Sequence, residues 1–421
     1  MSMNLLIVPK PLFTDKMVVE AYYMASQYGN AILESTKSNP FDRAMDSPFI
    51  DFMEEVGLDA LTQRLPVFIP ITQIQLLTPL NEKITEETEK VILLLRENVV
   101  FDDLAVEQCK RFSEMGFRLA AYYRGNADAI LPVKPYLEFI FLYDTPAEKV
   151  VDVSVEVYRS FPHATVVAPD IPKKKMFEQI GMHSGSQIEL YGGAFYKAGT
   201  AKNTKQNALS PLKTNYIQLL NIVSQEDFDF QTFTRTIRQD TALAIQFMRL
   251  VNTSSKAHQE IKNFNQAAAM LGQKEIKKWV STAVSNALCV DSPSEITRLS
   301  LLRAKFCENL AHHFGQTASM ENLFLMGLFS VLGVILEIPI EDALKMVFVP
   351  TQIHNALLKQ EGDYYSVLYF VQQYELGHWK EISRVALVRD ISIDQIHHAY
   401  KEALLWYSNL INSTITQSEF E

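Results

Sequence analysis

Residues 117–143 read FRLAAYYRGNADAILPVKPYLEFIFLY and contain two apolar runs, 117–121 and 138–143, separated by a polar segment. Apart from Arg118 and Glu138, both runs are apolar and do not alternate strictly, which is typical of parallel strands covered on both faces. Similar runs recur on either side, at residues 18–24, 66–71, 91–95, 165–168 and 187–191. Helical patterns lie between them, for example at 103–115 and 147–161. The pattern predicts a parallel α/β domain, either a (β/α) barrel or a doubly wound sheet.

The chain changes character near residue 200. Residues 198–208, AGTAKNTKQNA, are small and polar, which is typical of an exposed linker. Beyond them the periodicity is almost entirely helical, with Asp229 and Asp240 placed to cap two of the helices. We therefore predict an α/β domain at 1–200, a linker at 201–208, an all-helical domain at 209–405 and a C-terminal tail at 406–421, frayed from residue 412 onward.

Composition narrows the class of protein. The 421 residues carry 39 Lys and Arg against 49 Asp and Glu, a net charge of −10, which argues against general nucleic-acid binding. Cys109, Cys289 and Cys307 are far apart in sequence, as expected for reduced thiols in a cytosol. The most apolar stretch, residues 322–336, is shorter than the roughly 20 residues of a membrane span. We expect a buried helix there and a cytoplasmic protein without membrane insertion.

The N-terminal half resembles the EAL family of cyclic di-GMP phosphodiesterases. Three segments carry the resemblance: KPLFTDK at residues 10–16, VEAYYM at 19–24 and QIELYGGAFYK at 187–197. They are similar, in order and spacing, to that family's opening "QPIFD", its name-giving motif and its closing "QGYYFSKP". The resemblance covers about residues 5–198 and implies a TIM-like barrel.

EAL enzymes hold two divalent metals with carboxylates and an asparagine, because hard oxygen ligands suit such ions. By the resemblance, Glu20 stands at the motif's glutamate and Glu97 at a second one, while the phosphate-binding arginine falls on Met24. The remaining functional positions fall on Pro70, Leu94, Tyr122, Tyr123, Phe141, Pro169 and Tyr191. Proline, leucine and aromatic side chains cannot replace charged ligands, so we expect neither a metal site nor hydrolysis.

Binding without turnover is a separate question. Tyr122, Tyr123 and Tyr191 are candidates to stack on a nucleotide base at the barrel mouth, together with Glu20 and Glu97. The alternative is that these side chains fill the space at the barrel mouth that the metals occupy in EAL enzymes. We list the five residues as candidate ligand-binding residues and expect no cofactor.

The C-terminal half resembles the HDOD family, an all-helical relative of HD metal phosphohydrolases. The resemblance covers about residues 209–405. Its signatures are IRQDTAL at 237–243, FMRLVNTS at 247–254, NQAAAMLG at 265–272 followed by IKKW at 276–279, and YELGHW at 374–379. By the resemblance, the His-Asp dyad falls on Ser330 and Val331, so the HD metal site is also expected to be absent.

We expect the remaining polar residues of this half to support the fold rather than to form a site. Asp240, Arg249 and Asn252 are expected to support helix ends and packing, with partner contacts as the alternative. The adjacent pairs His312-His313 and His397-His398 point about 100° apart on a helix, which disfavours a shared metal. We expect surface or loop histidines.

A degenerate EAL-like domain followed by HDOD resembles a known type of bacterial signalling protein. The resemblance implies a non-catalytic signalling or scaffold protein that contacts other signalling proteins, with a homodimer raised by analogy alone. A sensor that binds cyclic di-GMP or another nucleotide at the barrel mouth is the alternative. A residual enzyme is the third reading, and no nucleophile triad, Walker loop or GxGxxG supports it.

Overall fold

The chain folds into two compact units. The computed structural model describes residues 5–28, 30–32, 48–78, 80, 84, 87–197, 211–225, 227–253, 263–288, 294–347 and 349–415. The first unit joins Met1–Ala198 to Phe370–Glu421, and the second is Gly199–Tyr369. The sequence analysis assigned residues 209–405 to one helical domain, whereas the contacts group the part from Phe370 onward with the barrel. The predicted linker lies outside the described residues.

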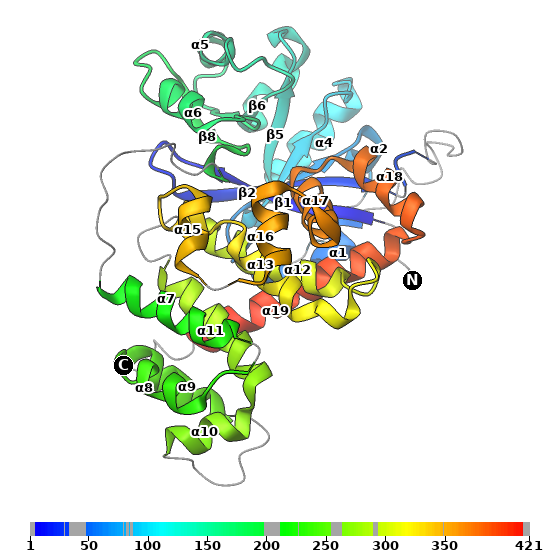
Figure 1. Ribbon diagram of the computed structural model, residues 1–421. Helices are drawn as coiled ribbons and strands as arrows, with labels where there is room; N and C mark the ends of the chain where they lie inside the picture. The colour runs from blue at the N-terminus through cyan, green and yellow to red at the C-terminus, as the bar shows by residue number, and fades with distance from the viewer. Residues whose placement is uncertain are drawn as a thin grey trace. The chain divides into compact units, whose positions relative to one another are not determined.

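The first unit contains a closed eight-stranded barrel with the strands in chain order (Figure 1). β1 pairs antiparallel with β2 and β8, and all other neighbours are parallel. Closure confirms the barrel and excludes the doubly wound sheet. The strands are β1 Leu5–Phe13, β2 Val19–Tyr28, β3 Val67–Ile71, β4 Val91–Leu95, β5 Arg118–Tyr123, β6 Leu137–Leu142, β7 Thr165–Ala168 and β8 Ile188–Tyr191.

The strand β1 is the one that the sequence analysis missed. Its sequence, LLIVPKPLF, contains Pro9 and Pro11, which cannot donate to a ladder. β1 pairs with β2 along its whole length but with β8 only through Phe13 and Tyr191, so the prolines are tolerated. The other seven predicted strands are confirmed.

The barrel interior is a single apolar cluster. Its members come from alternate positions of the strands, as the two-residue period of a strand requires. They are Leu12, Ala21, Phe68, Ile92, Leu94, Ala120, Phe139, Phe141, Val167 and Leu190, with Tyr23 and Tyr122 packed against them.

Helices cover the outside of the barrel. They are α1 Pro48–Thr62, α2 Gln73–Leu76, α4 Asp103–Glu114, α5 Val150–Ser160 and α6 Lys174–Gly181. Asp102, which follows β4, caps α4 by accepting a hydrogen bond from the Ala105 amide at 2.8 Å. Cys109 is a buried free thiol inside α4, and burial raises its pKa to about 12.

The C-terminal segment of the first unit is helical: the last turns of α17 Gly362–Leu376, then α18 Trp379–Arg389 and α19 Ile393–Ile415. α19 lies against β1 and α1 (Figure 1). Tyr407, 2% exposed, accepts a hydrogen bond from the Gln63 amide at 2.6 Å, and Lys401 pairs with Glu55. Residues 406–415, assigned to the C-terminal tail from sequence, therefore continue α19, which packs on the barrel through Tyr407.

The second unit is entirely helical in its described part. Its helices are α7 Pro211–Ser224, α8 Phe230–Ile237, α9 Thr241–Thr253, α10 Phe264–Leu271, α11 Gln273–Leu288, α12 Ser294–Leu310, α13 Met320–Phe329, α14 Leu332–Ile335, α15 Ile340–Met346, α16 Thr351–His354 and the first turns of α17. The predicted caps are confirmed: Asp229 accepts from the Gln231 and Thr232 amides, and Asp240 from the Leu243 amide.

The apolar stretch at 322–336 folds as α13 and α14 in the core of this unit. Every residue from Leu323 to Phe329 is buried. Thr317–Ile335 is the one described segment long and apolar enough to cross a membrane, and 61% of its apolar window is buried within the protein. Burial on this scale fits the core helix expected from sequence.

Candidate functional site

The carboxyl ends of the barrel strands, where barrel enzymes place their active sites, are lined by apolar side chains. Leu94 and Phe141 are fully buried in the interior cluster, and Pro70 shares the inward face of β3 with Phe68. These are three of the positions that the EAL resemblance assigns to metal ligands or to the catalytic lysine. Among the described residues, no group of three or more His, Cys, Asp and Glu side chains could hold a metal ion. The donor set does not fit the pair of metals that an EAL enzyme requires.

Two tyrosines complete the filling of the mouth. The Tyr23 ring lies 6.2 Å from the Phe141 ring, and the Tyr122 ring lies 5.7 Å from the same side chain, both edge to face. Tyr122 also contacts Tyr143 just after β6, with ring centroids 5.2 Å apart. Each such aromatic pair stabilises a fold by about 0.5–1.5 kcal/mol beyond the contribution of the apolar area that it buries. The space over the core is therefore packed with aromatic rings.

A lysine beside Tyr23 supplies the charge at the mouth. Burial lowers the pKa of Lys10 to about 8, although the Asp170 carboxylate opposes that shift. Burial, together with the Asp170 charge, raises the pKa of Tyr23 to about 12. The Lys10 ammonium lies 5.8 Å from the centre of the Tyr23 ring. The partly buried Lys10 and Tyr23 and the exposed Asp170 thus form one polar group beside the apolar interior.

The C-terminal segment closes over this polar group. Lys10 Nζ donates to the Leu376 carbonyl at 2.8 Å, and Lys197 Nζ pairs with the Glu375 carboxylate at 3.1 Å. Gly377 follows with a φ of 70° and packs against the Lys10 side chain. Both lysines at the mouth are therefore engaged by the turn that ends α17.

Tyr374 fixes the position of that turn. Its side chain is fully buried, and its hydroxyl donates to the Ile7 carbonyl at 2.8 Å and accepts from the Ile7 amide at 3.2 Å. Trp379 and Tyr400 pack against its ring, with centroids 5.4 and 4.8 Å away. The segment YELGHW at 374–379, which the resemblance assigned to the HDOD half, is thus part of the barrel unit.

The five candidate ligand-binding residues do not form one site. Tyr122 faces the interior, and Glu97 lies beside it after β4. Tyr123 and Tyr191 are buried on the outside of the barrel: the Tyr123 hydroxyl bonds Glu156 of α5, and the Tyr191 ring packs on Phe177 of α6 at 5.2 Å. Side chains alternate along a strand, so neighbours such as Tyr122 and Tyr123 point to opposite faces.

Glu20 is also outside the mouth. It is the second residue of β2, near the amino end of the strand, and its side chain is exposed. Its inward-facing neighbours on β2 are Ala21 and Tyr23. The charge of Glu20 helps burial to raise the pKa of Glu189 in β8. Tyr23, rather than Glu20, is the β2 side chain that reaches the mouth.

A small cavity lies between the ends of β4 and β5. Its volume is about 60 Å³. Its polar lining comes from Arg96, Glu97, Tyr122, Arg124 and Asn126. One water occupies about 30 Å³ of liquid volume, so the cavity has room for about two waters.

Sequence reasoning missed Lys10, Asp170 and Lys197 as a group. Lys10 and Lys197 appeared only as letters of the opening and closing motifs, and Asp170 was not considered. The available signal was Lys10, a charged residue inside the apolar run 5–13. Its partners in α17 are more than 360 residues away, and sequence offers no means of finding them.

In the second unit, the two HD dyad positions hold residues without metal-binding chemistry. Ser330 Oγ donates to the Gly327 carbonyl at 2.6 Å and accepts from Arg303 Nη1 at 2.7 Å. Val331 is buried. The guanidinium of Arg303 brings a fixed positive charge to this position, which is the opposite of what a metal site requires.

The histidines are mostly, but not all, at the surface. His312 and His398 are exposed, and His313 is half-buried. His397 contradicts the prediction, because it is 5% exposed and its Nδ1 lies 2.8 Å from the Leu5 carbonyl in β1. Burial lowers its pKa. His258 lies outside the described residues, and so does Cys289.

Comparisons with known proteins agree with this organisation. An HDOD domain model matches residues 209–347. The uncharacterized protein YuxH of Bacillus subtilis is 25% identical over 98% of this chain and 100% of its own length. The cyclic di-GMP phosphodiesterase CdgJ of Vibrio cholerae is 31% identical over 49% of this chain, and the match spans 48% of that protein.

Among solved structures, the similar ones are EAL proteins. Klebsiella pneumoniae BlrP1, in a calcium and cyclic di-GMP complex, aligns with 45% of this chain and 54% of its own at 14% identity and a TM-score of 0.36. The EAL-domain protein YkuI of Bacillus subtilis aligns with 64% of this chain and 73% of its own at 13% identity and a TM-score of 0.32. The chain thus combines an N-terminal EAL-like barrel with an HDOD domain at residues 209–347.

Proposed function

We propose that this chain is a non-catalytic component of cyclic di-GMP signalling that acts through contacts with other signalling proteins. The EAL-like and HDOD domains support the signalling context. The observation that carries the non-catalytic part is the filled barrel mouth, where Leu94, Phe141, Tyr23 and Tyr122 pack together. The proposal places the protein in the cytoplasm, where that nucleotide signal is read.

Hydrolysis of a phosphodiester by a two-metal mechanism needs hard ligands that neutralise charge on the attacking and leaving oxygens. At this mouth, Glu97 lines the small cavity, and the Asp170 charge acts on Lys10 and Tyr23. Two isolated carboxylates fall short of the six or more oxygen ligands typical of Ca²⁺ or the octahedral shell of Mg²⁺. We therefore assign the barrel a structural and recognition role.

The sensor alternative rests on the basic residues. Lys10 and Lys197 sit at the mouth, and Arg96 and Arg124 line the small cavity nearby, so phosphate-binding charge is present. Space argues against it: sites for drug-sized ligands span about 300–1,000 Å³, whereas this cavity measures about 60 Å³. Both lysines are also engaged by the turn after α17. Nucleotide binding would require that turn to leave.

Calorimetric titration of the full chain with cyclic di-GMP separates the two functions. The proposed function predicts no saturation at tens of micromolar, which corresponds to binding weaker than about −6 to −7 kcal/mol. Saturable binding that Lys10→Ala and Lys197→Ala each weaken would support the sensor instead. Lys110→Ala, which changes an exposed lysine in the later turns of α4, serves as the matched control.

Affinity capture with the intact chain from native lysate tests the contact function itself. A specific protein partner, retained when the barrel mouth is altered by Tyr122→Phe, is the expected result. Recovery of the chain without any protein partner, whether monomeric or as a homodimer only, would contradict the proposal.

A further inference from the structure

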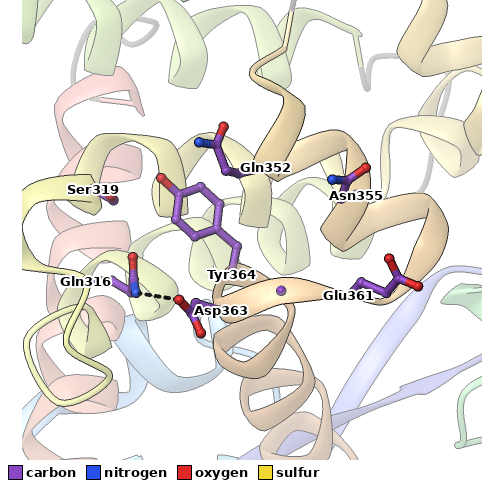
Figure 2. A pocket seen from close by; sticks show the side chains of 8 residues that line it. Gln316, Ser319, Gln352, Asn355, Glu361, Asp363 and Tyr364 are labelled. Atoms are coloured by element: carbon purple, nitrogen blue, oxygen red, sulfur yellow. Dashed lines mark hydrogen bonds between the residues drawn. The ribbon is translucent and has the colours of Figure 1, made fainter.

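A polar cavity of about 480 Å³ lies in the helical unit, outside both ancestral metal sites (Figure 2). The 3₁₀ turn Thr317–Ser319 with the residue before it, the α16 segment with its π-helical extension Asn355–Lys359, and the start of α17 form its walls. Its volume falls in the range of about 300–1,000 Å³ that is usual for small-molecule sites. The lining residues are Gln316, Ser319, Gln352, Asn355, Glu361, Gly362, Asp363 and Tyr364.

The charge of the lining is negative. Glu361 and Asp363, both exposed, are the two carboxyl groups of the set, and no lysine, arginine or histidine of the described part of the chain lines the cavity. The amino end of α17 contributes a partial positive charge of about 0.5, which two carboxylates exceed. The cavity therefore favours a cation.

The neutral groups define what kind of cation fits. Gln316, Gln352 and Asn355 each carry a side-chain amide, and Figure 2 shows Gln316 and Gln352 beside the Tyr364 ring, with Asn355 farther from it. Tyr364 is 7% exposed, and its hydroxyl accepts a hydrogen bond from the Asn322 amide at 3.2 Å. A ligand with several N–H donors in one plane would satisfy the carboxylate and the amide oxygens together.

One hydrogen bond across the cavity is long and therefore weak, so a ligand could replace its donor. Gln316 Nε2 donates to Asp363 Oδ2 at 3.4 Å (Figure 2). A charged N–H donor bonds a carboxylate at about 2.7–2.9 Å and roughly twice as strongly as a neutral one. A ligand cation would thus replace the amide of Gln316 at Asp363 with a net gain.

We propose that this cavity is a binding site for a small organic cation that carries a guanidinium group. A guanidinium is planar, weakly hydrated and always charged, and it matches carboxylate and amide oxygens in a fork. A divalent metal is a poorer fit, because only two carboxylates line the space and such ions need six or more oxygen ligands. The site stands independently of the barrel and of the proposed signalling role.

The test compares two probes of nearly the same shape, butylguanidine and butylurea, by titration of the full chain followed by calorimetry. Butylguanidine, which is protonated at neutral pH, is expected to bind saturably at millimolar or lower concentrations, and neutral butylurea at least about tenfold more weakly. Asp363→Asn and Glu361→Gln are each expected to weaken butylguanidine binding about tenfold.

The matched control is Asp342→Asn, which removes the same charge from an exposed position on α15 where the carboxylate pairs with Lys345. This variant should bind butylguanidine like the parent chain. Equal binding of both probes, no saturation with butylguanidine, or an equal loss in Asp342→Asn would each overturn the proposal.

Discussion

The barrel mouth and the polar cavity of the helical unit differ in what occupies them. At the barrel mouth, aromatic rings fill the interior and the chain's own Leu376 carbonyl and Glu375 carboxylate engage the two lysines. In the helical unit, amides and carboxylates surround an open space of about 480 Å³. The first region is filled by packed side chains, and the second keeps unfilled polar surface.

This difference predicts how each region responds to substitution. At the barrel mouth, Leu94 and Phe141 are part of the core and contribute to stability. Polar side chains around an open space contribute little to stability and remain available for a ligand. Substitutions in the two regions should therefore have effects of very different size.

The largest effect is expected from Phe68→Ala. Phe68 is fully buried, and its ring centroid lies 4.9 Å from the ring centroids of both Phe139 and Phe141. Its loss should lower the free energy of unfolding by about 3–5 kcal/mol, measured by urea denaturation. The contrasting variant Gln352→Ala, which lines the open cavity, should stay within about 0.5 kcal/mol of the parent. Similar losses of unfolding free energy in the two variants would contradict the difference between the barrel mouth and the cavity.

A smaller effect is expected from Gly192→Ala, at the turn after β8. A Cβ at this position would lie 2.5 Å from the Pro169 carbonyl oxygen, so the two loops would have to separate. Overpacking of this kind costs about 1–3 kcal/mol, which thermal unfolding would show as a lower midpoint. Gly181→Ala in α6 is the control, since nothing lies within 4 Å of its added Cβ. A neutral Gly192→Ala would mean that this end of the barrel is loosely packed.

Tyr374→Phe tests how the C-terminal turn is held. The change removes the hydroxyl that bridges the amide and carbonyl of Ile7 while it keeps the ring packing. We expect a loss of about 1–3 kcal/mol, because buried polar groups are left without a partner. Tyr365→Phe, on the same helix, should be nearly neutral. Hydrogen exchange of the Ile7 amide would rise in Tyr374→Phe, and unchanged protection there would contradict the role assigned to this hydroxyl.

The smallest effect concerns pH and His397. Burial lowers the pKa of His397 in the folded protein, so below pH about 6.5 the unfolded chain takes up a proton that the folded chain resists. Stability should therefore fall as the pH falls from about 6.5 towards the folded-state pKa. His397→Asn removes the titrating group, and the difference between the two unfolding profiles isolates it from Glu55, Lys401 and Asp394 nearby. A difference that does not change with pH would contradict the assignment.

Much of the fold could be predicted from the sequence, because many of the seven predicted strands are continuous apolar runs and most helices show strong periodicity. The candidate site could be predicted less well. The aromatic pair Tyr122 and Tyr123 was assigned to one mouth, although strand alternation sends Tyr123 under α5. The closing turn could not be predicted either, since Lys10 and Leu376 are joined only by the folded chain. A contact between residues this far apart in the chain leaves no local pattern in the sequence.

The most direct test of the central claim is a turnover assay of the full chain with cyclic di-GMP and excess Mg²⁺ or Mn²⁺. Because apolar and aromatic side chains replace the metal ligands at the barrel mouth, we expect no metal-dependent product above the level of the buffer. An active EAL phosphodiesterase in parallel would validate the assay. Hydrolysis that follows this protein through gel filtration, and that Glu20→Ala or Glu97→Ala removes, would contradict the account.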